Sequence, residues 1–162
     1  MNKRWLRDQL AARIRESAES AERERDSAAI EARDGATPAE KREDARVAIE
    51  YASLAKGQSM RAERARTDLG ALERFDPPPL RKGAPIAVGS VVEVEGEEDA
   101  RTFFLAPVGA GIELSGPGGD GFLSVVTPAS PFGRAVMGRK VGDSIEVEVK
   151  GTAKEWTITY AC

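Results

Sequence analysis

Three carboxylates lie close together in the first half of the chain and could bind a metal ion. Glu40, Glu43 and Asp44 are spaced at i, i+3 and i+4, so in a helix their side chains would share one face. Clustered carboxylates at an exposed position can hold a Mg²⁺ ion that keeps most of its waters. Acidic side chains also stabilise a helix N-terminus without any ligand. These residues alone leave both interpretations open.

The composition excludes several other kinds of site. The 162 residues include no histidine, the commonest neutral-pH base and metal ligand, and one cysteine, Cys162, the last residue. An internal disulfide and a zinc–thiolate site are therefore excluded. The net charge of −3, from 24 basic and 27 acidic residues, argues against non-specific nucleic-acid binding. Residues 1–75 hold 16 basic and 15 acidic residues, so the first half is densely charged but balanced.

The chain shows no signal for secretion or membrane insertion. Its first ten residues, MNKRWLRDQL, are charged from the start. No apolar run approaches the roughly 18 residues that a spanning helix needs. We therefore expect a soluble, cytoplasmic protein with no membrane partner.

Two long helices are predicted to position the carboxylates. Residues 5–33 contain no proline or glycine. Their apolar residues recur three or four apart, on one helical face: Leu6, Leu10, Ile14, Ala18 and Ala21. A turn follows at 34–37, and Thr37-Pro38-Ala39-Glu40 has the pattern of a capping box that begins a second helix, over residues 38–74.

The second helix carries a heptad pattern made mostly of alanine. The predicted seam is Ala45, Ala48, Ala52, Ala55, Ser59, Ala62, Arg66 and Leu69. Small seam residues let two helices approach closely, so the pattern predicts a narrow antiparallel hairpin within one chain, with residues 34–37 at its tip. Because such a hairpin covers its own seam, we expect a monomer.

The second half of the chain has strand-like patterning. Asp76-Pro-Pro-Pro-Leu80 ends the helix and opens a stiff linker over residues 76–85. Short β-prone runs follow at residues 86–95, 101–106, 112–114, 122–126, 144–149 and 155–160. A helix at 131–138 interrupts them, and we expect a small antiparallel sheet to curl around it and bury Phe132, Val136 and Met137. The fold class is α+β, with domains at 1–75 and 86–162.

Two other features have structural or functional interpretations. The glycines of residues 109–111 and 116–121 are each followed by a strand-like run rather than a helix, which favours hairpin turns over a phosphate-binding loop. The basic residues Arg134, Arg139 and Lys140 form either a solvated face or a docking surface for a partner.

The layout resembles the bacterial GreA/GreB transcript cleavage factors. The specific match is SPFGRAVMGRKVGD at residues 130–143, which is similar to the family pattern SPxxRALLGKxxGD. The resemblance covers nearly the whole chain, more loosely in the hairpin, and implies a C-terminal domain of FKBP-like fold. It also implies that Ser130, Pro131 and Arg134 dock on RNA polymerase at the rim of its secondary channel while the hairpin reaches toward the active centre.

The resemblance gives the acidic residues a role inside the polymerase. The family's hairpin tip, GDLxENAEY, carries an Asp and a Glu that help to hold a Mg²⁺ ion of the polymerase during cleavage of nascent RNA. Counted back from Glu50-Tyr51, the Asp falls on Asp44 and the Glu on Val47, while Glu43 and Glu40 are candidate substitutes. Ala129 stands where the family often has Asp. The resemblance thus implies a partner that donates carboxylates, Asp44 and Glu43 as shared metal ligands, and no cofactor or enzymatic activity of its own.

Alternatives remain at this point. Val47 in place of an acid would suit a factor that occupies the channel and competes with active factors without stimulating cleavage. An FKBP-like domain could be a prolyl isomerase, although fold does not imply function and aromatic residues for a proline pocket are few: Phe103, Phe104, Phe122, Phe132, Trp156 and Tyr160. The alanine seam could instead dimerise a scaffold. DNA binding is reported for the family but cannot be inferred from these residues.

Overall fold

The structure, a computed structural model, consists of two compact units. It describes residues 2–34, 43–97, 99–116, 121–149 and 151–162, without the side chains of residues 32–34, 43 and 44. One unit contains Met1–Ala12 and Ala71–Cys162, and the other contains Arg13–Gly70. None of the helices in these ranges combines the length and apolar composition that a membrane span requires.

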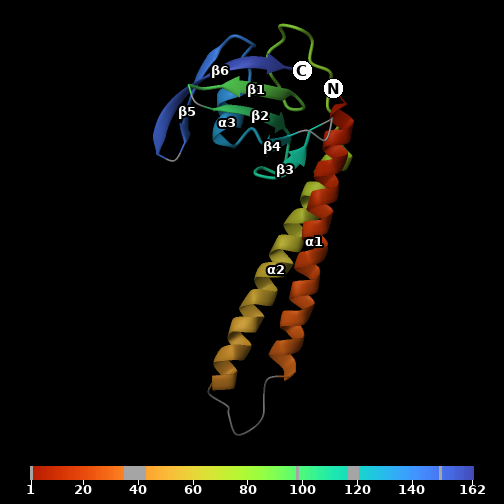
Figure 1. Cartoon of the computed structure of the whole chain (residues 1–162). Coiled ribbons are helices and arrows are strands. Elements are labelled where there is room, and N and C mark those ends of the chain that lie inside the picture. The colour runs from red at the N-terminus through yellow and green to blue at the C-terminus, as the bar shows by residue number, and fades with distance from the viewer. Residues whose placement is uncertain (1, 35–42, 98, 117–120, 150) are drawn as a thin grey trace. The chain divides into compact units, whose positions relative to one another are not determined.

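The two expected helices form the hairpin. Helix α1 spans Lys3–Asp34 and α2 spans Glu43–Glu73. They lie side by side and run in opposite directions (Figure 1). Two contacts show the antiparallel order: Arg66 pairs with Glu22, and Gln58, which comes earlier in α2, donates to Glu24, which comes later in α1. The predicted turn at 34–37, its capping box and the first residues of the expected second helix lie largely outside the described residues.

The structure confirms the buried face of α1 and corrects that of α2. Every apolar position predicted for α1 is buried. On α2, however, Ala52, Ser59 and Arg66 are exposed. The side that faces α1 carries Tyr51, Ala55, Gln58, Ala62, Ala65 and Leu69, all buried or half-buried. The predicted seam is therefore right at Ala48, Ala55, Ala62 and Leu69 but wrong at Ala45, Ala52, Ser59 and Arg66.

The error has a simple physical cause. Alanine occupies two overlapping faces of α2, so counting small residues does not determine which face packs. Larger residues decide it. Leu72, almost completely buried, continues the observed phase at the end of α2, and the Gln58 side chain reaches across to Glu24. The buried face follows these contacts rather than the alanine count.

The C-terminal half of the chain forms one six-stranded sheet and one short helix, α3, over Pro131–Val136. The structure confirms each predicted strand, although the first begins at residue 91 instead of 86 and the last begins at residue 152 instead of 155. The strands are β1 Val91–Glu95, β2 Ala100–Leu105, β3 Glu113–Ser115, β4 Phe122–Val126, β5 Ser144–Val149 and β6 Thr152–Ala161.

The sheet has the order β3-β4-β2-β1-β6-β5. Four of its neighbouring pairs are antiparallel, but β2 and β4 pair in parallel, with Phe104 opposite Val125. The expected antiparallel sheet is thus a mixed one. The α+β class is confirmed: two long helices precede a domain made of a mixed sheet and one short helix.

Helix α3 fills the core on one face of this sheet (Figure 1). Phe132 and Val136 are buried as predicted, and the Phe132 ring lies 4.6 Å from that of Phe103 and 5.3 Å from that of Trp156. Met137 was predicted to join them, but it is 38% exposed. The helix has ended at Val136, so the next side chain is not directed at the core.

The start of α1 belongs to the C-terminal unit. The Gln9 side chain exchanges two hydrogen bonds with the backbone of Ser115, at 3.2 and 3.4 Å, and Arg4 pairs with Asp76 at 2.8 Å. The ammonium group of Lys3 donates to the carbonyl of Pro78, and burial lowers its pKa. The first three turns of α1, which the sequence assigned to the hairpin, are thereby bound to the β domain.

Candidate functional site

Ser130 holds together the loop that precedes α3. Its hydroxyl donates to the carbonyl of Thr127 at 2.8 Å and accepts from the amides of Thr127 and Gly133, both at 3.2 Å. Ser130 is therefore the N-cap of α3, and Pro131 fills the first helical position, where no amide donor is needed. Because its hydroxyl is fully used within the chain, Ser130 shapes the predicted docking segment rather than offering a free group to a partner.

Gly133 has no room for a side chain. A Cβ atom at this position would lie 1.9 Å from the carbonyl oxygen of Thr127 and 2.9 Å from the Ser130 hydroxyl. The backbone of α3 approaches the Thr127 loop this closely because Phe132 and Val136 draw the helix into the core. The glycine in SPFGR is thus a steric requirement of the segment.

The opposite side of α3 faces solvent. Pro131 and Arg134 are exposed, and exposed Met137, Arg139 and Lys140 follow them. We call these five residues the α3 surface. It combines one proline ring and one thioether with three cationic side chains, which suits a partner that offers carboxylates around a small apolar contact.

Backbone hydrogen bonds hold the residues after α3 in place. Ile86 forms two backbone hydrogen bonds with residues that follow α3, both at 2.8 Å: its amide donates to the carbonyl of Arg139, and its carbonyl accepts from Gly138. The carboxylate of Asp143 accepts from the amide of Lys140 at 2.9 Å and closes the next turn. Gly138 has a φ of 75°, a left-handed conformation that side chains disfavour. The spacing of the signature therefore reflects folding requirements.

The acidic candidates fall at the edge of the described structure. Glu40 lies outside the described residues, and Glu43 and Asp44 begin α2, where only their backbone is described. Val47, in the position where the resemblance expects an acid, is 43% exposed. Its neighbour Arg46 forms an i,i+4 ion pair with Glu50 at 3.5 Å. No group of three acidic, histidine or cysteine side chains in the described ranges could hold a metal ion.

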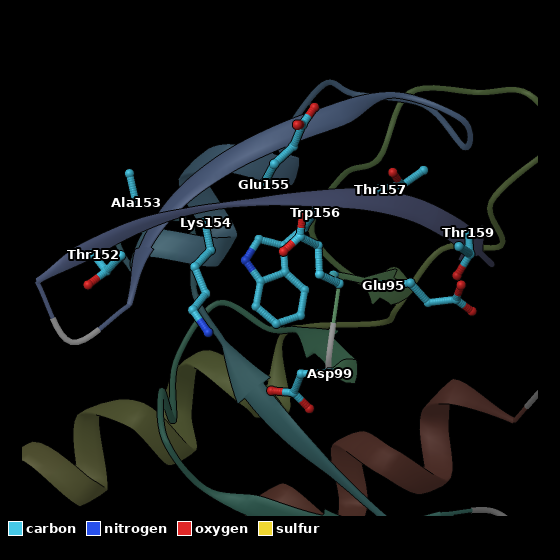
Figure 2. Close-up of a pocket in the computed structure, with 11 residues that line it drawn as sticks. Glu95, Asp99, Thr152, Ala153, Lys154, Glu155, Trp156, Thr157 and Thr159 are labelled. Atoms are coloured by element: carbon cyan, nitrogen blue, oxygen red, sulfur yellow. The ribbon is translucent and has the colours of Figure 1, made fainter.

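A second feature, which the sequence analysis missed, lies around Trp156. The Trp156 indole is 2% exposed, and the guanidinium carbon of Arg101 lies 5.2 Å from the centre of its ring. Figure 2 shows the indole beside Lys154 and Asp99, in a cavity of about 810 Å³. The alternation of polar and apolar residues over 154–158 could have predicted that Trp156 is buried, but it does not indicate which residues surround it.

The arrangement of aromatic residues argues against a prolyl isomerase site. Phe103, Phe104, Phe132 and Trp156 are buried, where they supply core packing. The cavity beside Trp156 is lined by no other aromatic residue among those described. The proline-binding pocket that an isomerase would need is therefore not formed by these side chains.

The scaffold alternative also loses its main argument. Ala18, Ala21 and Ala28 of α1 are buried together with Ala62 and Ala65 of α2 in a single chain. Their apolar surface is thus covered without a second copy. The hairpin does not require dimerisation through its alanine residues.

Comparison with known proteins identifies the C-terminal half of the chain. The model of the family described as transcription elongation factor GreA/GreB, C-terminal, matches residues 82–161, which include α3 and the whole sheet. A search of curated protein sequences found no match.

Several solved structures are similar to the chain. One is transcription factor Gfh1, with 21% identity, a TM-score of 0.41, and coverage of 94% of this chain and 93% of that one. GreA factor homolog 1 (Gfh1) of Thermus thermophilus has 17% identity and a TM-score of 0.39, covering 96% and 94%. Transcription elongation factor GreA/GreB from Nitrosomonas europaea has 18% identity and a TM-score of 0.37, covering 60% and 77%.

Proposed function

The chain belongs to the GreA/GreB family of transcription elongation factors, and we propose that it binds bacterial RNA polymerase at the secondary channel. There it would modulate elongation of paused or backtracked complexes. The α3 surface carries this proposal, because the family match covers it and because Ser130, Gly133 and Asp143 hold it in one conformation. A preformed surface loses little conformational entropy on binding.

Arg134 and Pro131 are the proposed contacts. Arg134 is exposed, and a planar guanidinium can bind a partner's carboxylate through two parallel hydrogen bonds. Pro131 is exposed at the first position of α3, where its ring is rigid. Ser130 contributes indirectly, through the loop that it caps.

The hairpin would act inside the polymerase without being an enzyme itself. In this proposal Asp44 and Glu43, with Glu40 as a further candidate, add carboxylates near a Mg²⁺ ion held by the polymerase. That ion would supply Lewis-acid activation of water for hydrolysis of the nascent RNA. The chain's own contribution would be to place negative charge and to contact RNA only indirectly.

A factor that binds without stimulating cleavage is the second candidate. The observation that favours it is Val47, an exposed apolar side chain at the position where the family carries its second acid. With Asp44 as the only matching carboxylate, the tip would offer one ligand instead of two. We favour this competitor slightly over a cleavage-stimulating factor.

Docking can be tested with a charge reversal on the α3 surface. Pro131→Ala combined with Arg134→Glu should abolish co-precipitation with RNA polymerase, because it removes the rigid contact and inverts the charge. Neither change removes core volume, so the melting temperature should be nearly unchanged. Arg81→Glu, at an exposed arginine outside the α3 surface, is the matched control. Wild-type binding by the double variant would refute the docking assignment.

The role of the hairpin can be tested on backtracked complexes. The competitor hypothesis predicts no RNA cleavage above that of polymerase alone, together with inhibition of cleavage stimulated by an active GreA. If the wild type instead stimulates cleavage, Asp44→Asn and Glu43→Gln should each reduce it without affecting binding, and higher Mg²⁺ should partly restore it. Neither stimulation nor competition would contradict both hypotheses.

A further inference from the structure

Strand β6 has a stretch of edge that no neighbouring strand covers. It pairs with β5 along Thr152–Thr157, but β1 reaches it only from Thr157 onward, starting with the pair Glu95 and Thr157. Since β1 ends at Glu95, residues 152–156 have no strand on their β1 side within the described chain. We call this stretch the open edge.

Two residues of the open edge direct their backbone groups outward. The amide of Ile158 donates to the carbonyl of Asp143 at 3.0 Å, and its carbonyl accepts from Gly142 at 2.8 Å. Ile158 therefore points its backbone groups toward the β5 side. Because these directions alternate along a strand, Glu155 and Ala153 point theirs toward the open edge, and no hydrogen bond within the described residues occupies them.

A groove runs along the open edge. It is the cavity of about 810 Å³ beside Trp156, and Gly96, Glu97 and Asp99, which lie between β1 and β2 in the sequence, also line it. Figure 2 shows Asp99 beside the indole. Trp156 forms a rigid floor, since it is almost completely buried and Gly96 packs against its ring. Its Nε1 donor has no acceptor among the described residues, so the floor carries an unsatisfied polar atom.

The charges around the groove select its occupant. Glu95, Glu97 and Glu155 are exposed and form no ion pair within the described part of the chain, whereas Asp99 is paired with Arg101 at 2.9 Å. Lys154 is the one described cation among the lining residues. A second copy of this edge would bring Glu155 against further carboxylates, and like charges on neighbouring strands repel.

We propose that the open edge binds an extended, basic segment of a partner protein, which adds to the sheet as a strand along Ala153 and Glu155. Main-chain hydrogen bonds to the open edge would supply affinity, and pairing of lysine or arginine side chains with Glu95, Glu97 and Glu155 would supply selectivity. This site contains none of the five residues of the α3 surface, so the proposal does not depend on polymerase docking.

Binding can be measured with a fluorescein-labelled decapeptide of alternating lysine and valine, by fluorescence anisotropy with the full chain. A decapeptide of alternating glutamate and valine is the matched probe. We expect saturable binding of the basic peptide, at least tenfold tighter than that of the acidic one, and weakening as salt rises. Trp156 is a second reporter in a Trp5→Phe background, where its emission should change on binding.

Ala153→Pro tests the open edge itself. Proline removes the amide that points outward but none that pairs with β5, so it should weaken the basic peptide at least tenfold. Ala153→Val is the control, because it keeps that amide and should bind as the wild type does. Glu97→Lys with Glu155→Lys leaves the backbone intact and should also lose at least tenfold, which tests the proposal even if the proline variant does not fold.

Several results would overturn the proposal. They are equal binding by the proline and valine variants, equal binding of the acidic and basic peptides, or loss of peptide binding in Pro131→Ala with Arg134→Glu. Self-association of the chain that Ala153→Pro abolishes would also overturn it, since the occupant would then be a second copy. Polymerase co-precipitation should be unchanged in Ala153→Pro, so failure here is distinguishable from failure of the proposed function.

Discussion

The hairpin and the β domain are stabilised in different ways. The β domain buries three aromatic rings around α3 and fixes its loops by specific hydrogen bonds, as at Ser130 and Asp143. Between residues 13 and 70, the hairpin buries mainly alanine, together with Ile14 and Gln58. Alanine buries little area per residue, so each hairpin contact contributes little free energy.

This difference predicts how each region responds to substitution. In the β domain many positions have one acceptable residue, because the side chain fills a closed space or forms a particular bond. In the hairpin, most positions face solvent and only the stripe toward the other helix is restricted. The α3 surface is therefore expected to be rigid, and the hairpin helices are expected to tolerate substitution.

The largest expected effect is at Gly133. Gly133→Ala places a methyl group on the carbonyl of Thr127, a backbone atom that cannot move without shifting the loop capped by Ser130. We expect a loss of about 3 kcal/mol or more of unfolding free energy, at the upper end for overpacking. Urea denaturation followed by tryptophan fluorescence measures it. A loss below about 1 kcal/mol would show that the loop is less constrained than the contact implies.

A large side chain in the hairpin tests which face of α2 packs. Ala62→Trp, at a position that is 2% exposed, should destabilise the protein by about 1–3 kcal/mol. Ala52→Trp, at an exposed position, should change stability by less than about 0.5 kcal/mol. Thermal melts of the two variants compare them directly. A larger effect at position 52 would restore the face that was predicted from the sequence.

The hairpin also contains a glycine that can be replaced with benefit. Gly57 lies inside α2, and a Cβ there would meet no atom within 4 Å. Gly57→Ala should therefore stabilise the hairpin by about 0.5–1 kcal/mol, the difference in helix propensity. Circular dichroism melts would detect the gain. The same change, glycine to alanine, is thus expected to stabilise the hairpin at residue 57 and to destabilise the β domain at residue 133.

The smallest expected effect concerns the ion pair between Arg4 and Asp76. The hydrogen bond from Arg4 lowers the pKa of the Asp76 carboxyl below its ordinary value. The stability that this ion pair contributes is therefore present above the ordinary pKa of an aspartate, and it is lost as the pH falls through the lowered pKa of Asp76. Asp76→Asn should lower the melting temperature slightly at pH 7, and the difference from the wild type should shrink as the pH is lowered through the acid range. Both side chains are exposed, so 1 M salt should remove the difference.

The sequence predicted most elements but not all of their partners. Leu6, Leu10 and Ile14 repeat at helical spacing, and the strands alternate between apolar and polar residues, so local pattern was sufficient to place them. The prediction of which face of α2 packs on α1 was partly wrong because alanine can lie on either of two overlapping faces of the helix. The prediction that Met137 is buried was wrong because the end of α3 depends on the backbone hydrogen bonds that follow it.

The sequence by itself determined which residues belong to the signature, because SPFGRAVMGRKVGD brings its residue types together in one short segment. Only the tertiary structure decided what each of them does. Ser130 and Gly133 are internal because the Thr127 loop folds back on them, whereas Pro131 and Arg134 remain outside. The open edge beside Trp156 likewise exists because β1 ends at Glu95 while β6 continues to Thr152. Strand lengths across a sheet are set by long-range pairing, which no local pattern in the sequence records.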